Sequence, residues 1–209
     1  MYRIRLHQAI FSLGCFFLSL CAISCDSGNQ KTAVDGFVLS SSDYALTCDP
    51  AGASELSYAC QLAYYTNRDR ASHPLESDNA APLRWNDDLE NIAAAYSREM
   101  CDRGFFDHID PDGATLNDRM NEAGLVWVKA GENLAKGTDM NPDLAEKMFM
   151  NEPSCQANHR GNVLDNDFTD IGVGTVFCGN DTIYTELFAT FNQEDLRNDA
   201  NDYCHYSQY

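Results

Sequence analysis

The first half of the chain contains two stretches in which apolar residues recur at the 3.6-residue period of an α-helix. The first stretch begins at Leu56 and continues through residues 67–70. The second follows Asn86, whose side chain can cap a helix, and continues to Gly104, a residue type that ends helices. Acidic residues in its first turn suit the positive end of the helix dipole. We therefore expect two helices, the second being the clearer.

Two shorter helices are predicted further along the chain. One covers about residues 114–123. The other begins at Asn141-Pro142, since proline suits the first position of a helix, and ends at Pro153. Its inward-facing residues are expected to be Leu144, Ala145, Met148 and Phe149.

The last third of the chain has the two-residue alternation of β-strands. Residues 171–177 and 183–191 show it, and the turn residues 179–181 separate them, which predicts an antiparallel hairpin. Residues 126–128 predict one further strand. Helices come first and strands later, without the alternation of a parallel α/β sheet, so we expect an α+β layered domain.

The beginning of the chain has the pattern of a secretory signal. Two arginines precede the apolar run 9–20, which is too short to span a bilayer comfortably. The run ends in Ala22-Ile23-Ser24-Cys25, which resembles a bacterial lipobox. We expect residues 1–24 to be removed and Cys25 to be acylated. The alternative is ordinary cleavage nearby with an unmodified Cys25.

The remaining chain divides into three parts by composition. Residues 25–55 are rich in Ser, Gly, Asp and Ala, which suits a linker between a lipid anchor and a folded domain, with little regular structure. Residues 56–191 form the predicted domain. Residues 192–209 form a polar, acidic tail, which Cys204 is expected to tie back.

The cysteine count indicates the compartment of the protein, and the net charge limits its possible partners. The net charge of -18 excludes nucleic acid as a partner, because a phosphate binder needs a basic surface. An even set of cysteines in an exported chain is what three disulfides require, although the sequence leaves about 15 pairings open. The disulfide candidates are Cys48, Cys60, Cys101, Cys155, Cys178 and Cys204.

Three segments concentrate polar residues where a core pattern would not require them: 104–113, 131–135 and 151–164. They include Phe106-Asp107-His108, Gly131-Glu132-Asn133 and His159-Arg160-x-Asn162. Together with Asn67-x-x-Arg70 and Pro82-Leu83-Arg84-Trp85-Asn86, in this order, they resemble the CAP superfamily, also called the SCP domain. Cysteine-rich secretory, antigen-five and pathogenesis-related proteins belong to it. The resemblance covers about residues 56–191.

The resemblance implies an α-β-α sandwich, in which helices cover both faces of a three- to four-stranded antiparallel sheet. It also implies a surface cleft with two histidines and two acids. Matched residue by residue, these are His108, Glu132, Glu152 and His159. Imidazole nitrogens and carboxylate oxygens are ligands of divalent cations, so we expect Zn²⁺ or another divalent cation there. They could equally act as a general acid/base pair, or only hold helix ends to the sheet.

Two departures from the family pattern affect this site. An insertion between Asn151 and Asn158 precedes His159, and Cys155 in that insertion could restrain the loop by a disulfide. Tyr96 stands on the long helix where relatives often have histidine. If the residue at that position affects the chemistry of the cleft, its effect differs in this chain.

The resemblance implies a binding module, and the signal pattern with its lipobox predicts that this module is exported and anchored to a membrane through a lipid. We expect it in the bacterial cell envelope, either membrane-anchored, periplasmic or at the surface, or outside the cell. Its partners would be a divalent cation, a lipid or other apolar small molecule, or a surface protein. A metal-dependent hydrolase of peptides or cell-wall material is the alternative, although no serine or free cysteine lies in the matching motifs. A structural acidic surface protein is a third.

Overall fold

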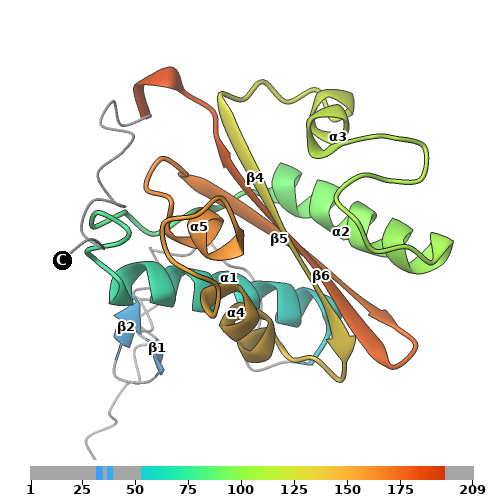
Figure 1. The fold of residues 1–209 in the computed structure, drawn as a ribbon, viewed down its shortest axis with the longest axis horizontal. Helices are drawn as coiled ribbons and strands as arrows, with labels where there is room; N and C mark the ends of the chain where they lie inside the picture. Colours follow the sequence, from blue (N-terminus) through green and yellow to red (C-terminus); the bar gives the residue numbers. More distant parts are fainter. Residues whose placement is uncertain (1–31, 35–36, 40–52, 196–209) are drawn as a thin grey trace, which may run out of the picture.

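A computed structural model of the chain describes residues 32–34, 37–39 and 53–195 (Figure 1). Within 53–195, helices lie on both sides of a four-stranded sheet. In chain order the elements are β1 (Thr32–Val34), β2 (Phe37–Leu39), α1 (Glu55–Ser72), β3 (Arg84–Trp85), α2 (Asp87–Arg103), α3 (Leu116–Glu122), β4 (Lys129–Thr138), α4 (Pro142–Met150), α5 (His159–Leu164), β5 (Asp170–Cys178), β6 (Asp181–Thr190) and the 3-10 helix η1 (Gln193–Asp195).

The sheet has the strand order β3-β5-β6-β4 and is mixed. Strands β5 and β6 form the predicted antiparallel hairpin, and β4 pairs with β6 antiparallel. Strand β3 runs parallel to β5, with Arg84 opposite Asp170, so the prediction of a wholly antiparallel sheet is wrong at this edge. Two strands joined by a tight hairpin must pair antiparallel, but strands joined by a long connection can also pair parallel. Here three helices beyond α2, together with α2 and β4, lie between β3 and β5 in the chain, so β5 can run beside β3 in the same direction.

Both faces of the sheet are buried, which confirms the predicted three-layer sandwich. Alternate residues of a strand point to opposite faces. On β6, Tyr184 and Phe188 pack in the same core as residues of α1, α4 and α5. Leu187 packs with residues of α2 and α3 on the other face, and Ile183 packs with residues of α2.

Helix α2 lies very close to β5, and two glycines make this approach possible. A Cβ atom built on Gly174 would lie 2.1 Å from the backbone carbon of Ala93, and one on Gly172 would lie 2.2 Å from the backbone nitrogen of Glu90. The helix has the predicted ends: the Asn86 side chain accepts hydrogen bonds at its start, and Gly104 adopts a left-handed conformation with φ 70° at its end. The chain then turns into the segment that carries His108.

The Asn67-x-x-Arg70 motif fastens α1 to two connecting segments. The Asn67 side chain donates to the Leu83 carbonyl at 3.0 Å and accepts from the Leu83 amide at 2.7 Å. Arg70 is 1% exposed and donates to the carbonyl oxygens of Val163 at 2.8 Å and Asp165 at 2.7 Å. Arg70 therefore holds the end of α5 against α1.

The inward face predicted for α4 is only half correct. Ala145 and Phe149 are buried as expected, but Leu144 is 46% exposed and Met148 is 47% exposed. Glu146 takes a place in the interior instead, with no exposed surface. The prediction placed only apolar residues on the inward face. A carboxyl can be buried there because the Thr66 hydroxyl on the neighbouring α1 forms a hydrogen bond with Glu146.

Four further segments differ from the expectations. Residues 126–128 are not a strand, although the Val128 amide donates to the Thr190 carbonyl just before β4 begins. Strand β4 and helix α5 had not been predicted, because small and polar residues hide their periodicity. Within 25–55, where little regular structure was expected, β1 and β2 pair antiparallel.

The described part of the chain contains no helix that is both long and apolar enough to cross a membrane.

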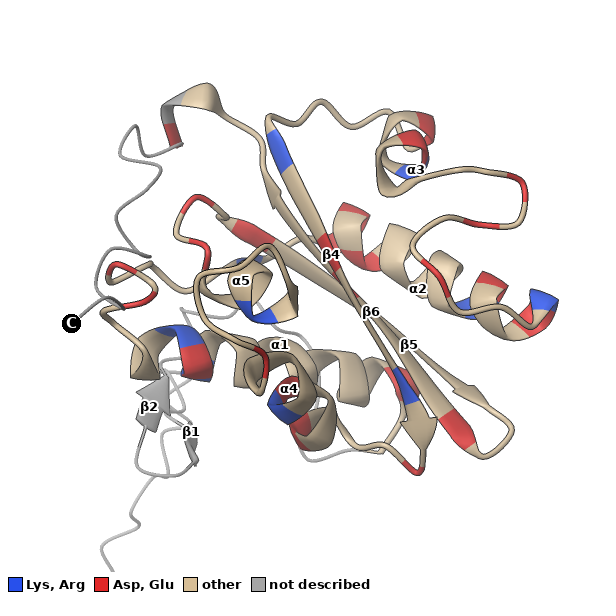
Figure 2. Cartoon of the chain, in the orientation of Figure 1, with Lys and Arg blue, Asp and Glu red and all other residues tan. Residues whose placement is uncertain are grey.

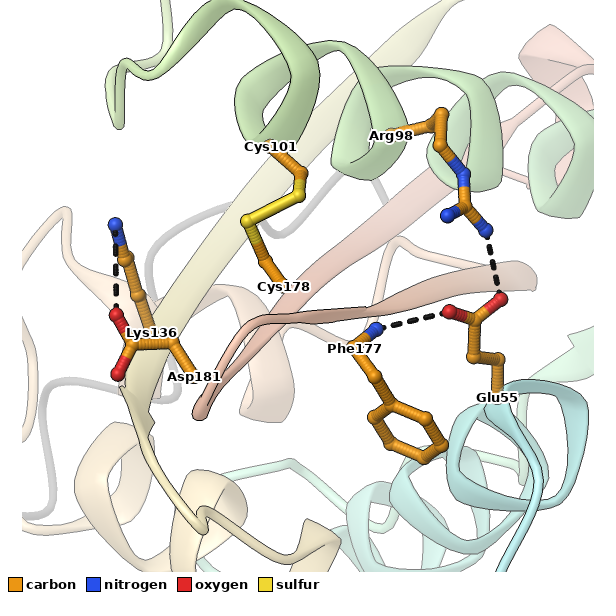
Figure 3. Close-up of a disulfide and its surroundings, with 7 residues drawn as sticks. All are labelled: Glu55, Arg98, Cys101, Lys136, Phe177, Cys178 and Asp181. Carbon is orange, nitrogen blue, oxygen red and sulfur yellow. Dashed lines mark hydrogen bonds and ion pairs between the residues drawn. A yellow bond between two sulfur atoms is a disulfide. The ribbon is translucent and has the colours of Figure 1, made fainter.

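One disulfide in the described residues joins Cys101 near the end of α2 to Cys178 at the end of β5, with the Cα atoms 5.6 Å apart (Figure 3). Nearby, Glu55 at the start of α1 accepts from Arg98 at 2.7 Å and from the Phe177 amide at 2.9 Å. Cys60 is also disulfide-bonded, while Cys155 lies in the loop before α5. The predictions for residues 1–24, Cys25, Cys48 and Cys204 lie outside the described residues.

Candidate functional site

The candidate site lies at β4, the edge strand of the sheet. Successive residues of a strand point to opposite faces, so Glu132 and its neighbour Asn133 reach different layers. Glu132 contacts Arg119 of α3, whereas Asn133 contacts the backbone of His159 at the start of α5. Strand β4 therefore brings the two sequence-predicted halves of the site together.

The first half is a pair of His108 with Glu132. His108 Nδ1 and Glu132 Oε1 are 2.8 Å apart, and the other oxygen of Glu132 accepts from Arg119 at 2.5 Å. The Glu132 side chain is 4% exposed, whereas that of His108 is 53% exposed. The hydrogen bond to Glu132 raises the pKa of His108 against the opposing effect of partial burial. Glu132 thus orients an imidazole ring that reaches solvent.

Tyr96 supports this pair from α2. The guanidinium carbon of Arg119 lies 3.4 Å from the centre of the Tyr96 ring, a cation–π contact. The Tyr96 hydroxyl donates to the Asp107 carbonyl at 2.6 Å, beside His108. Burial raises the pKa of Tyr96 to about 12, so the hydroxyl remains a donor at neutral pH. The residue that departs from the usual histidine therefore positions Arg119 and the His108 segment.

The second half is a pair of His159 with Glu152. His159 Nδ1 lies 2.8 Å from Glu152 Oε1, and the His159 amide donates to Glu152 Oε2 at 2.8 Å. Both side chains are 31% exposed. The Phe149 ring lies 5.1 Å from the His159 ring. Despite the insertion before it, His159 begins α5 at the position that the motif predicts for a site residue.

Hydrogen bonds across β4 hold the two halves in register. Asn133 donates to the His159 carbonyl at 3.2 Å. Asn162 of α5 donates to the Asn133 side-chain oxygen at 2.8 Å and to the Glu132 carbonyl at 3.3 Å. The two imidazole rings stack at an angle of 30°, with their centres 6.4 Å apart. All four predicted site residues therefore lie together, as two His–Glu pairs.

The fold and this arrangement agree with a match to a known family. Residues 63–192 match the model of the cysteine-rich secretory protein family, CAP. The chain belongs to the CAP family. It is 32% identical over 162 residues to the uncharacterized protein YkwD of Bacillus subtilis (strain 168). That match covers 78% of this chain and 58% of the relative.

Solved structures also resemble this CAP domain. An extracellular protein containing a SCP domain from Bacillus anthracis str. Ames matches with a TM-score of 0.56 and 29% identity, over 65% of this chain and 41% of that protein. An outer surface protein from Borrelia burgdorferi matches with a TM-score of 0.55 over 64% of this chain and 92% of that protein. At 21% identity, this second likeness shows the fold alone. The chain thus spans well under two thirds of YkwD and of the B. anthracis protein.

Within the part of the chain that the structure describes, the hydrogen bonds of the two site histidines to side chains use Nδ1. Glutamates bind both Nδ1 atoms, so the Nε2 atoms remain as donors or as metal ligands. Among the residues that the structure describes, no three His, Cys, Asp or Glu side chains are arranged to hold a metal together. Arg119, Asn133 and Asn162 also contact the site residues, but sequence alone assigned them no role. Their contacts with the site residues are what assign one.

Proposed function

We propose that this CAP domain binds a divalent cation such as Zn²⁺ through the Nε2 atoms of His108 and His159. One observation carries the proposal: each histidine has its Nδ1 bound to a carboxylate at 2.8 Å. Histidine ligands in metal sites usually have their other ring nitrogen bound in this way, which fixes the ring and raises its basicity. Glu132 and Glu152 would therefore orient the ligands.

The donor set fits an open site better than a closed one. Structural zinc sites use four protein ligands, whereas two imidazoles leave positions for water or for a ligand of the protein. A bound cation would supply a positive centre that attracts carboxylate or phosphate groups. With two protein ligands, we expect weaker binding than in a structural zinc site.

The contacts of the carboxylates favour binding over hydrolysis. A hydrolase needs a base that is free to take a proton from water. Glu132 is occupied by His108 and Arg119, and Glu152 is occupied by the ring and amide of His159. We therefore infer a binding module, with the metal-dependent hydrolase as the second candidate.

Calorimetric titration of the full-length protein with zinc, in detergent, tests the cation site. We expect His108→Ala and His159→Ala each to weaken binding at least about 10-fold, since each removes a ligand. We expect Glu132→Gln and Glu152→Gln to weaken it about 10- to 100-fold, as is typical of partners that orient metal ligands. His73→Ala, at the far end of α1, is the control. Unchanged zinc affinity in the His108→Ala/His159→Ala double variant would contradict the proposal.

We further propose that the protein is exported and anchored by a lipid on Cys25. The description of the B. anthracis relative as extracellular supports export. The net charge is -18, and Asp and Glu are spread over α2, α3 and their connection (Figure 2). This negative charge agrees with a partner other than nucleic acid. Cys25→Ser should move the protein from the detergent phase to the aqueous phase in a partitioning experiment. An unchanged distribution would argue against acylation.

A further inference from the structure

Two buried carboxyl groups meet between the layers, away from the candidate cation site. Glu146 comes from α4 and Glu186 from β6, and neither has exposed surface. Both contact the hydroxyl of Thr66 on α1, at 3.1 Å for Glu146 Oε2 and 2.5 Å for Glu186 Oε1. Because no substrate can reach them, this pair has no part in surface binding.

The Thr66 hydroxyl has too few hydrogens to serve all of its neighbours if both carboxyls are ionised. The Thr66 oxygen lies near three acceptors, since the Leu62 carbonyl is also 3.1 Å away. A hydroxyl has one hydrogen, and ionised carboxylates can only accept. With both glutamates ionised, at least one carboxylate would face Thr66 without a hydrogen between them. With a proton on Glu186, that carboxyl donates to Thr66, and Thr66 donates onward.

The surroundings do not neutralise two negative charges. Burial raises the pKa of Glu146 well above its usual range, and the nearby charges of Glu186 and Asp69 raise it further. Burial also raises the pKa of Glu186 to about 7, although Thr66, Asn133 and the Arg70 guanidinium act in the opposite direction.

The cations on α1 offset this negative charge only in part: Arg70 lowers the pKa of Glu186, and Arg68 and Glu146 attract each other. Arg70 donates to four backbone carbonyls, one in α5 and three on connecting segments. Arg68 lies 3.2 Å from Asp69 and 3.8 Å from Asp143 of α4. A proton on the carboxyl pair removes part of the charge that these cations leave.

This cluster is linked to the segment that carries His159. The second oxygen of Glu186 accepts from Asn133 at 3.0 Å, and the same amide nitrogen donates to the His159 carbonyl at 3.2 Å. Glu146 lies one turn before Phe149 on α4, and Phe149 contacts the His159 ring. A change of charge in the cluster therefore acts on both supports of His159.

We propose that Glu146, Glu186 and Thr66 form a proton-sharing cluster that locks α4 and α5 to β6, and that loss of its proton loosens residues 142–164. This inference goes beyond the cation site and does not depend on it. The cluster makes the His159 side of the site responsive to pH, while the His108 side rests on the separate contact of Glu132 with Arg119.

The direction of the pH effect follows from the raised pKa. An ordinary glutamate ionises near pH 4.3 in the unfolded chain. The folded state retains its proton to higher pH, so the cluster favours folding at low pH, and this advantage declines as the pH rises from about 4.5 through about 7. Glutamine at these positions removes the titration while it keeps the shape of the side chain.

Carbon-13 NMR of glutamate-labelled full-length protein in detergent micelles tests the shared proton. Signals of Glu146 and Glu186 are assigned by their loss in Glu146→Gln and Glu186→Gln. We expect at least one to titrate near pH 7 or above, about two or more units above an ordinary glutamate. Glu122, exposed on α3, provides a reference signal away from the cluster. Titration of both signals below pH 5 would overturn the proposal, and wild-type protein alone suffices for this result.

Hydrogen exchange tests the coupling to the site. Between pH 6 and pH 8.5, after correction for the intrinsic pH dependence of exchange, protection of residues 142–164 should fall at least about 10-fold more in the wild type than in Glu186→Gln. Residues 116–122 of α3 should change equally in both proteins. Equal loss of protection in wild type and Glu186→Gln would show that the cluster does not control this segment. Thr66→Ser, which keeps the hydroxyl, should behave as the wild type.

Discussion

The two His–Glu pairs should respond very differently to loss of the carboxylate charge. In the first pair, Glu132→Gln removes the charge that faces Arg119 at 2.5 Å, where the two side chains are 4% and 11% exposed. Arg119 Nε is already buried without a hydrogen-bond partner among the described residues, so its charge depends on Glu132. In the second pair, Glu152 and His159 are each 31% exposed, so water can replace the hydrogen bonds that the lost charge strengthened.

These exposures set the expected magnitudes. Removing one partner of a buried ion pair costs about 3–5 kcal/mol, and glutamine can still accept one hydrogen bond. We therefore expect Glu132→Gln to lower the free energy of unfolding by about 3 kcal/mol. Glu152→Gln breaks a pair that solvent screens, so its cost should be about 0–1 kcal/mol.

Urea denaturation followed by tryptophan fluorescence measures both values, and NMR measures the pKa of His108 in the same variants. Glu132 raises this pKa in the folded protein, which stabilises the fold below about pH 6.5. The stabilisation is lost as the pH rises through the raised pKa. Glu132→Gln should therefore lower the His108 pKa and reduce this pH dependence. Equal destabilisation by Glu132→Gln and Glu152→Gln, or an unchanged His108 pKa, would refute the reasoning.

Two further predictions concern how the layers are held together. Gly174→Ala should cost about 3 kcal/mol or more in thermal or urea unfolding, because the added Cβ would overlap the α2 backbone at 2.1 Å. Gly124→Ala, where no atom lies within 4 Å but φ is 76°, should cost only about 1–2 kcal/mol, and similar values for both would exclude the steric explanation. Replacing Cys101 and Cys178 by alanine opens a disulfide with a sequence separation of 77 and should cost up to about 4.5 kcal/mol, measured against the oxidised wild type. A loss below about 1 kcal/mol would show that other contacts keep the unfolded chain equally constrained.

Much of the fold could be predicted from local signals. Asn86 and Gly104 mark the ends of α2, and the alternation of residues 171–177 and 183–191 marks the β5–β6 hairpin. Strand β4 was missed because its sequence, KAGENLAKGT, contains few apolar residues and gains its strand conformation by pairing with β6 along its whole length. The inward face of α4 was misjudged because the hydrogen-bonding partner of Glu146, Thr66, comes from α1, far away in the sequence.

For this protein, the sequence by itself determined the family, the order of the helices and the hairpin, and the identity of His108, Glu132, Glu152 and His159 as residues of interest. These features depend on capping residues, periodicity and motifs, which are local properties of the chain. Only the tertiary structure decided that the four residues form two separate His–Glu pairs, because β4 sends neighbouring side chains to opposite faces of the sheet. It also decided that Glu146 and Glu186 share one buried environment, since no local pattern shows which distant carboxyls will meet when three layers pack together.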